Sequence, residues 1–172
     1  MAQLIRILGI DPGSTATGWG VVDREGARLS FVAAGVIRPS KKVDHPARLA
    51  QIYNGLCDVL TDYRPCAAAV EETFVNASPR DALILGQARG IALLAPANVD
   101  IEVAEYAANS VKKSVVGKGH ADKTQVQTMV RVLLPSSGVQ PADAADALAV
   151  AICHAHHMDV KNLAAGSMRV SA

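Results

Sequence analysis

The stretch LIRILGIDPGSTATG, residues 4–18, decides the fold of this chain. Its first half is apolar, carries the β-branched residues Ile5, Ile7 and Ile10, and stops at Asp-Pro-Gly, so it predicts a buried β-strand that ends abruptly. Asp11 lies at that end, where a rigid element holds it at the crevice in which open α/β sheets bind ligands. We therefore interpret Asp11 as a metal ligand. The alternative is a turn residue whose side chain caps Asp-Pro-Gly.

Composition limits the classes of protein to which the chain can belong. With 172 residues, of which 50% are hydrophobic and 19% charged, it predicts one domain with a full core and excludes a disordered chain. The net charge of +1 does not by itself indicate a nucleic-acid-binding protein. The apolar start is interrupted by charge and proline, so we expect no signal peptide. Three cysteines without Cys-x-x-Cys spacing, Cys57, Cys66 and Cys153, predict reduced thiols and a cytoplasmic location.

Four further segments extend the sheet predicted from the first strand. TGWGVVD and RLSFVAAGVIR, separated by a short turn, predict an antiparallel three-strand meander. Apolar spacing of three and four residues from Ala47 predicts a helix that ends near Arg64-Pro65. CAAAVEETF then predicts a buried fourth strand, and IEVAEY a fifth. If the fourth strand lies parallel to the first, Glu71 or Glu72 falls near Asp11; the alternative is a solvated acid at a strand exit.

A helix predicted over residues 79–96 carries small residues at regular intervals. Ala82, Gly86 and Gly90 recur every four residues and form a smooth stripe on which another helix can pack closely. Because glycine costs about 1 kcal/mol relative to alanine inside a helix, the two glycines indicate a packing role. The neighbour is either the chain's own sheet or a second subunit.

The segment from Ala108 to Arg131 is basic. It contains five basic residues and one acidic residue, Asp122, which gives a net charge of 5 − 1 = +4. The basic residues are Lys112, Lys113, Lys118, Lys123 and Arg131. A Gly-Lys-Gly loop at residues 117–119 opens onto a predicted helix, an arrangement that suits a phosphate. The alternatives are a mobile polar loop and a solvated helical face.

Pro141 opens the last predicted helix, ADAADALAVAICHAHH. Asp143 and Asp146 are three residues apart and share a face, which is unusual in an apolar helix without its own Lys or Arg. One of them could simply complement the helix dipole. We interpret His154, His156 and His157 as partly exposed residues near the helix C-terminus rather than as metal ligands, and we expect residues 158–172 to be a disordered tail.

Acids at the ends of two strands and on a late helix predict a metal centre. Their oxygen ligands select Mg²⁺ or Mn²⁺. Two such ions about 4 Å apart can activate water and stabilise the leaving oxygen in a displacement at phosphorus. The predicted reaction is therefore phosphodiester hydrolysis.

Five motifs in order closely resemble the RuvC family of Holliday junction resolvases: GIDPGSTATGWGVV, AVEETF, LGQARG, EYAANSVKKSVVGKGHADKTQVQ and ADAADALAVAICH. The resemblance runs from about residue 4 to residue 157. It implies an α/β ribonuclease H-like fold, with a five-stranded mixed sheet flanked by helices in a single domain over residues 1–157. It also implies a homodimer that makes paired nicks in four-way DNA junctions during homologous recombination and repair, leaving 5′-phosphate and 3′-hydroxyl ends.

The resemblance also implies roles for individual residues. By position, the catalytic and metal-binding acids are Asp11, Glu71, Asp143 and Asp146, which selects Glu71 over Glu72. They would hold two Mg²⁺ ions per site, with Mn²⁺ as a substitute. The DNA-binding residues are Lys112 and Lys123 as phosphate contacts, Phe74 as an aromatic that stacks on an unpaired base, and Lys118 in its individual loop. The expected partner is a branch-migration complex of RuvA and RuvB.

Two other functions compete with this one. A junction-binding module could keep the fold without catalysis, but the presence of all the acids argues against it. An actin-like or sugar-kinase-type ATPase also places an Asp-x-Gly-Ser/Thr-like turn after its first strand, which residues 11–15 loosely match. Such an enzyme needs a second similar domain, for which this chain is too short.

Overall fold

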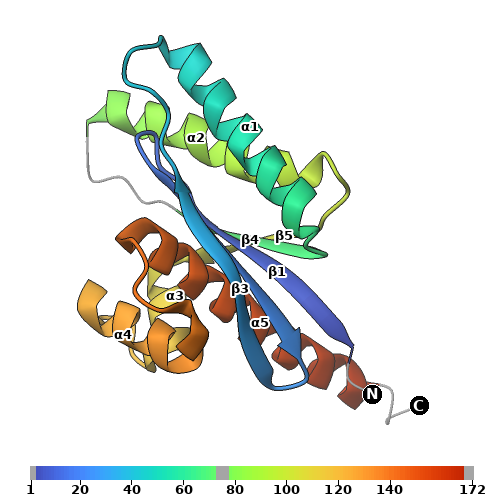
Figure 1. Cartoon of the computed structure of the whole chain (residues 1–172). Coiled ribbons are helices and arrows are strands. Elements are labelled where there is room, and N and C mark those ends of the chain that lie inside the picture. Colours follow the sequence, from blue (N-terminus) through green and yellow to red (C-terminus); the bar gives the residue numbers. More distant parts are fainter. Residues whose placement is uncertain (1–2, 73–77, 169–172) are drawn as a thin grey trace.

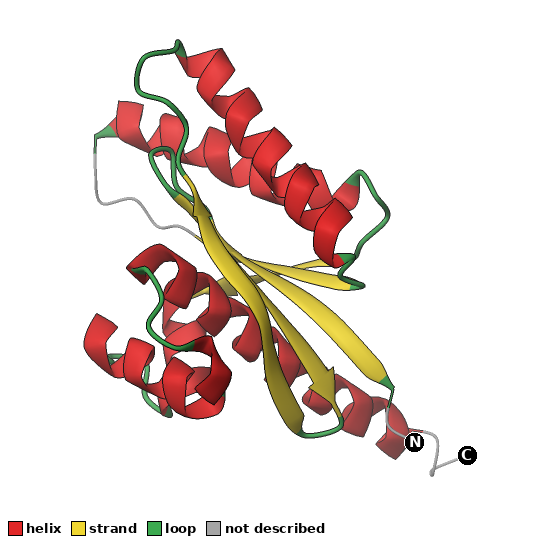
Figure 2. Ribbon diagram, viewed as in Figure 1, coloured by secondary structure: helices red, strands yellow, loops and turns green. Residues whose placement is uncertain are grey.

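A mixed β-sheet with helices on both faces forms the framework of the molecule (Figures 1 and 2). The computed structural model describes residues 3–72 and 78–168, with side chains described as far as residue 158. Helices α1 and α2 cover one face of the sheet, and α3, α4 and α5 cover the other. Within the described residues, none of the helices is long and apolar enough to cross a membrane.

The sheet has five strands in the order β3-β2-β1-β4-β5. Its first three strands form the predicted antiparallel meander, and the last two run parallel to β1. The bounds are β1 Leu4–Asp11, β2 Thr17–Glu25, β3 Arg28–Ile37, β4 Ala67–Glu72 and β5 Val103–Ala107. The predicted five-stranded mixed sheet, with an antiparallel three-strand meander and two parallel strands, is therefore confirmed.

The register of β1 and β4 brings two acids to the same edge. Ile10 of β1 lies opposite Val70 of β4, so the next residues along the two parallel strands are Asp11 and Glu71. Side chains alternate between the faces of a strand. Because Val70 packs in the core under α1 and α2, Glu71 points to the α5 face, whereas Glu72 does not. The predicted proximity of a β4 acid to Asp11 is therefore confirmed, and the acid is Glu71.

Helices α1 (His45–Tyr63) and α2 (Pro79–Ala97) form the outer layer on one face. The predicted periodicity of α1 is confirmed, since Ile52, Leu56, Val59 and Leu60 are buried beneath it. Asp44 caps its start by accepting a hydrogen bond from the backbone of Ala47. Arg64 ends it in the left-handed conformation just before Pro65.

The other face carries α3 (Ala108–Val116), α4 (Lys123–Leu133), a 3₁₀ turn (Pro135–Ser137) and α5 (Ala142–Met168). Helix α5 lies directly on the sheet. A Cβ atom added at Gly9 would fall 2.1 Å from the carbonyl oxygen of Ala147, and one added at Gly18 would fall 1.9 Å from that of Asp143. Only glycine at these two positions permits the close approach, which fixes the start of α5 over the ends of β1 and β2.

The C-terminal part of α5 differs from the prediction. We expected a disordered tail from Met158, but the helix continues to Met168 without a break. The segment contains no proline, so nothing ends the helix at the predicted domain boundary of residue 157.

The histidines of α5 lie near the middle of the helix, which continues to Met168. The prediction that they lie near the helix C-terminus was therefore wrong. His154 is buried, and its Nδ1 is 2.9 Å from the hydroxyl of Tyr106 on β5. His156 pairs with Ser114 of α3. His157, which is exposed, bonds back to the carbonyl oxygen of Cys153. The contacts of His154 and His156 join α5 to β5 and α3, and that of His157 lies within α5 itself.

We predict that Gly9→Ala destabilises the protein by about 1–3 kcal/mol, because the added methyl group meets the backbone of α5 rather than a side chain that can move. Chemical denaturation measures the effect. Gly119→Ala is the matched control, since its nearest neighbour is the Asn109 oxygen at an ordinary 3.5 Å, and it should change stability by less than about 0.5 kcal/mol. Equal stability of the two variants would contradict the close seating of α5.

Candidate active site

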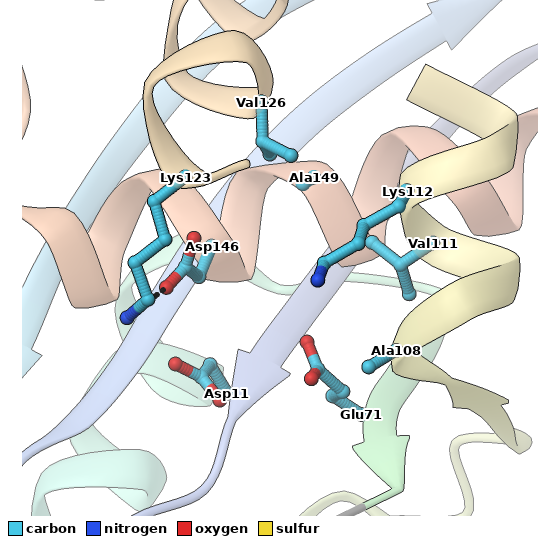
Figure 3. Close-up of a pocket in the computed structure, with 9 residues that line it drawn as sticks. All are labelled: Asp11, Glu71, Ala108, Val111, Lys112, Lys123, Val126, Asp146 and Ala149. Carbon is cyan, nitrogen blue, oxygen red and sulfur yellow. Dashed lines mark ion pairs between the residues drawn. The ribbon is translucent and has the colours of Figure 1, made fainter. Parts of the chain in front are cut away.

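A pocket of about 230 Å³ opens at the carboxyl ends of β1 and β4, beneath α3, α4 and α5 (Figure 3). Acids and lysines line it together with small apolar side chains. The lining residues are Asp11, Glu71, Ala108, Val111, Lys112, Lys123, Val126, Asp146 and Ala149. The pocket thus lies where open α/β sheets bind their ligands.

Three carboxylates enter this pocket from three different elements. Asp11 is the last residue of β1, Glu71 is near the end of β4, and Asp146 is on α5, in the region held against the sheet by Gly18. Figure 3 shows the three carboxylates facing the same space. The sequence prediction that Asp11, Glu71 and Asp146 lie together agrees with this geometry.

The pKa values of these acids are raised because the site is poorly hydrated and crowded with negative charge. Burial raises the pKa of Asp11 to about 8, and the charges of Glu71, Asp146 and Asp143 add to the effect. Burial also raises the pKa of Glu71 to about 7, with a further contribution from Asp146. The pKa of Asp146 is raised mainly by burial. The site therefore favours a bound proton or cation over a set of bare carboxylates.

Two lysines offset part of this charge. Lys123, the first residue of α4, places its Nζ 3.6 Å from a carboxylate oxygen of Asp146. Lys112, from α3, extends toward Glu71 and opposes the rise in the pKa of that acid (Figure 3). The Lys123 side chain is 76% exposed, so its contact is weak and its ammonium can reach other anions.

Asp143 occupies the edge of the site rather than the pocket itself. It is in the first turn of α5, and a carboxylate oxygen lies 3.8 Å from the guanidinium of Arg38, the residue that follows β3. Its charge still contributes to the raised pKa values of Asp11 and Asp146. The structure thus places three of the four predicted acids in the pocket. The fourth, Asp143, lies about one turn of α5 before Asp146, at the rim.

Of the remaining predicted DNA-binding residues, only Lys118 lies within the described part of the chain. Lys118 is exposed in the loop after α3 and does not line it. The N-terminus of α4 is already capped, because the side chain of Asp122 accepts from the backbone of Gln125 and the Gln125 side chain accepts in return. This capping box already uses the backbone N–H groups of Asp122 and Gln125, so these groups are not available to a phosphate at the start of α4. Phe74 falls within residues 73–77, outside the described residues.

Two arginines near the site were not predicted. Arg48 of α1 donates a 2.7 Å hydrogen bond to the carbonyl oxygen of Ser14 and so holds the loop that follows Asp11. The sequence signal that could have identified Arg48 is its charge on the half-buried side of the amphipathic helix α1. Arg38 lies beside Asp143, and nothing in the local sequence distinguishes it from an ordinary surface arginine.

The donor set fits a divalent cation. Carboxylate oxygens are the ligands that Mg²⁺ and Mn²⁺ prefer, and a dication would compensate the negative charges whose ionisation burial and neighbouring acids disfavour. In the part of the chain that the structure describes, no three His, Cys, Asp or Glu side chains are already gathered tightly enough to hold an ion. The carboxylates would therefore have to draw closer as an ion binds.

Comparison with known proteins gives one consistent result. The family model described as "Crossover junction endodeoxyribonuclease RuvC" matches residues 7–154. Proteins of that name from Rhodopseudomonas palustris and Nitrobacter hamburgensis are 57% and 58% identical to this chain. The first alignment covers 90% of this chain and 89% of the relative, and the second covers 89% and 90%.

Solved structures confirm the ribonuclease H-like fold. The structure of Thermus thermophilus RuvC in complex with a Holliday junction substrate is 34% identical and superposes with a TM-score of 0.85, covering 91% of this chain and 96% of that one. The yeast mitochondrial Holliday junction resolvase Ydc2 has a TM-score of 0.63 at 15% identity, over 88% of this chain and 78% of that one, and so shares the fold. From the family match and the close relatives, the chain belongs to the RuvC family of crossover junction endodeoxyribonucleases.

Proposed function

We propose that this chain resolves four-way DNA junctions by hydrolysing phosphodiester bonds in the pocket formed by Asp11, Glu71 and Asp146. The observation that carries the proposal is the meeting of these three half-buried carboxylates, two with pKa values near or above neutrality, in a member of a nuclease family. The family assignment favours this function over the ATPase alternative.

Asp11, Glu71 and Asp146 would hold Mg²⁺, with Asp143 at the rim completing the acidic set. Two bound ions would activate a water molecule and stabilise the leaving oxygen. The carboxylates supply the negative charge that concentrates such ions. Their positions on the sheet and on α5 hold the ligands in place without a flexible loop.

Lys112 and Lys123 would bind the phosphate backbone beside the acids. In the metal-free protein their ammonium groups oppose the carboxylate charge. With the acids holding cations, the two lysines would be available to contact phosphate oxygens. They would align the scissile strand for attack of water on phosphorus, and breakage of the bond to the 3′ oxygen would leave 5′-phosphate and 3′-hydroxyl ends.

Paired nicks require two active sites, and α2 offers a surface on which two copies could join. Leu83 and Leu94 are 70% and 50% exposed, and among the described residues nothing lies within 4 Å of a Cβ added at Gly86 or Gly90. The stripe thus does not face the chain's own sheet, which supports a homodimer through α2. A branch-migration complex of RuvA and RuvB as partner and a role for Lys118 and Phe74 in DNA binding are further proposals that rest on the family resemblance. A cytoplasmic location is a proposal that rests on the three cysteines.

We predict that Asp11→Asn abolishes junction cutting while junction binding persists, because an amide of nearly the same shape is a poorer ligand for a cation. Cleavage of a synthetic four-way junction in Mg²⁺ should fall by about a hundredfold or more. Asp62→Asn, a substitution of an exposed acid on α1, is the control and should cut normally. Joint loss of binding and folding in Asp11→Asn would show that Asp11 is structural, and binding without cutting by the unmutated protein would indicate a non-catalytic module.

We predict that the metal-free protein loses stability as the pH rises from 5 to 8. The folded-state pKa of Asp11, about 8, lies above its unfolded value near 3.8, so this stability is fully present below pH 3.8 and is lost as the pH rises through about 8. Glu71, with a pKa of about 7, acts in the same direction. Thermal denaturation in chelator should show the loss, and Asp11→Asn should reduce it.

The same titration tests the cation site. Since Mg²⁺ competes with protons for these carboxylates, it should raise the melting temperature more at pH 8 than at pH 5. An equal effect of Mg²⁺ at both values, or an identical pH dependence in Asp11→Asn, would argue against a shared cation site at Asp11.

We predict that Lys112→Ala weakens junction binding to a similar extent at all DNA sequences and lowers the slope of log affinity against log salt concentration by about one unit per protomer. Lys113→Ala is a matched control, because the neighbouring lysine is exposed and does not line the pocket. Binding assays over a range of salt concentrations measure both variants. A change confined to sequence preference would contradict the phosphate contact.

A further inference from the structure

Arg38 lies at the same edge of the sheet as the acids, but it belongs to a different element from the lysines. It follows Ile37, the last residue of β3, which pairs with Thr17 of β2. The next residue of β2, Gly18, lies opposite Asp11. Helix α5 contacts β3 here as well as α3 and α4. Lys112 and Lys123 therefore reach the acidic site from two helices packed on α5, whereas Arg38 reaches it from the end of β3.

The contact between Arg38 and Asp143 is not built as a structural ion pair. Its atoms are 3.8 Å apart, beyond hydrogen-bond length, and the two side chains are 60% and 38% exposed. An exposed pair of this kind contributes little to stability. The guanidinium also keeps its hydrogen-bond donors available, since this loose contact uses none of them.

Arg6, which starts from the same sheet, shows what a structural arginine looks like in this protein. It donates two hydrogen bonds of 2.7 and 2.8 Å to the carboxylate of Asp23 and a third to the carbonyl oxygen of Tyr63. Its side chain is 33% exposed, about half the value for Arg38. The difference indicates that Arg38 is placed at the rim for a partner other than the protein.

We propose that Arg38 binds a DNA phosphate next to the scissile one and grips the strand from the β3 side of the site. A guanidinium matches two phosphate oxygens at once, which makes arginine suited to this contact. Asp143 holds the guanidinium at the rim while DNA is absent. This contact is loose enough for a phosphate to displace Asp143 from the guanidinium without any bound cation. The inference rests on the proposed function.

The test is the affinity for a synthetic four-way junction in chelator, so that no strand is cut, measured over a range of salt concentrations. Arg38→Gln should bind about tenfold more weakly at low salt and lower the salt slope by about one unit per protomer. Arg38→Lys should keep the slope of the unmutated protein but lose part of the affinity, because it retains the charge without the paired donors. Arg28→Gln is the matched control: it removes an exposed arginine from the other end of β3 and should change neither quantity.

A second background separates a direct contact from an effect through Asp143. In Asp143→Asn protein, Arg38→Gln should still weaken binding and still lower the salt slope. Loss of both effects in that background would mean that Arg38 acts only by positioning Asp143, and would overturn the inference. So would an Arg38→Gln variant that binds as tightly as the unmutated protein. If the unmutated protein itself fails to bind the junction, the proposed function falls and this inference with it.

Discussion

The direct seating of α5 on the sheet determines where everything else at the site lies. Gly9 and Gly18 leave no side chain between the strands and the backbone of the helix, so the start of α5 is fixed over the ends of β1 and β2. That contact sets the position of Asp146 relative to Asp11. The parallel register of β1 and β4 sets the position of Glu71. The acidic pocket is therefore defined by the packing of α5 on the sheet and by the register of two strands, rather than by a loop. Helices α3 and α4 pack against α5 and bring Lys112 and Lys123 to this pocket.

The site is destabilising as it stands. Burial raises the pKa values of the three half-buried acids, neighbouring carboxylates add to the effect, and the contact of Lys123 with Asp146 is weak. Such an arrangement is typical of a functional centre, because a fold selected for stability alone would replace the acids with apolar residues. The core beneath the site supplies the compensating stability. Two continuous apolar clusters, one on each face of the sheet, hold the strands and helices in register.

Much of this arrangement could be predicted from the sequence, for identifiable reasons. The apolar run that ends at Asp11 and the short strand before Glu71 mark two strand ends, and parallel strands carry such ends to one edge. The spacing of Asp143 and Asp146 places both on one helical face. The sequence could not reveal that Asp143 turns to Arg38, because the two residues are far apart in the chain and meet only through the tertiary packing of β3 against α5. The histidines of α5 were misinterpreted for a related reason, since local pattern did not show where the helix ends.

The capping box at the start of α4 has a consequence for how quickly the site can respond. Asp122 and Gln125 hold the backbone on either side of Lys123, so the lysine has a fixed base and a free, mostly exposed stem. In the proposed function, exchange of its ammonium between Asp146 and a phosphate would need only rotation about side-chain bonds. Such rotations take place in picoseconds to nanoseconds, whereas movements of whole loops are slower. The ammonium of Lys123 would thus be able to follow an arriving DNA strand without any rearrangement of the fold.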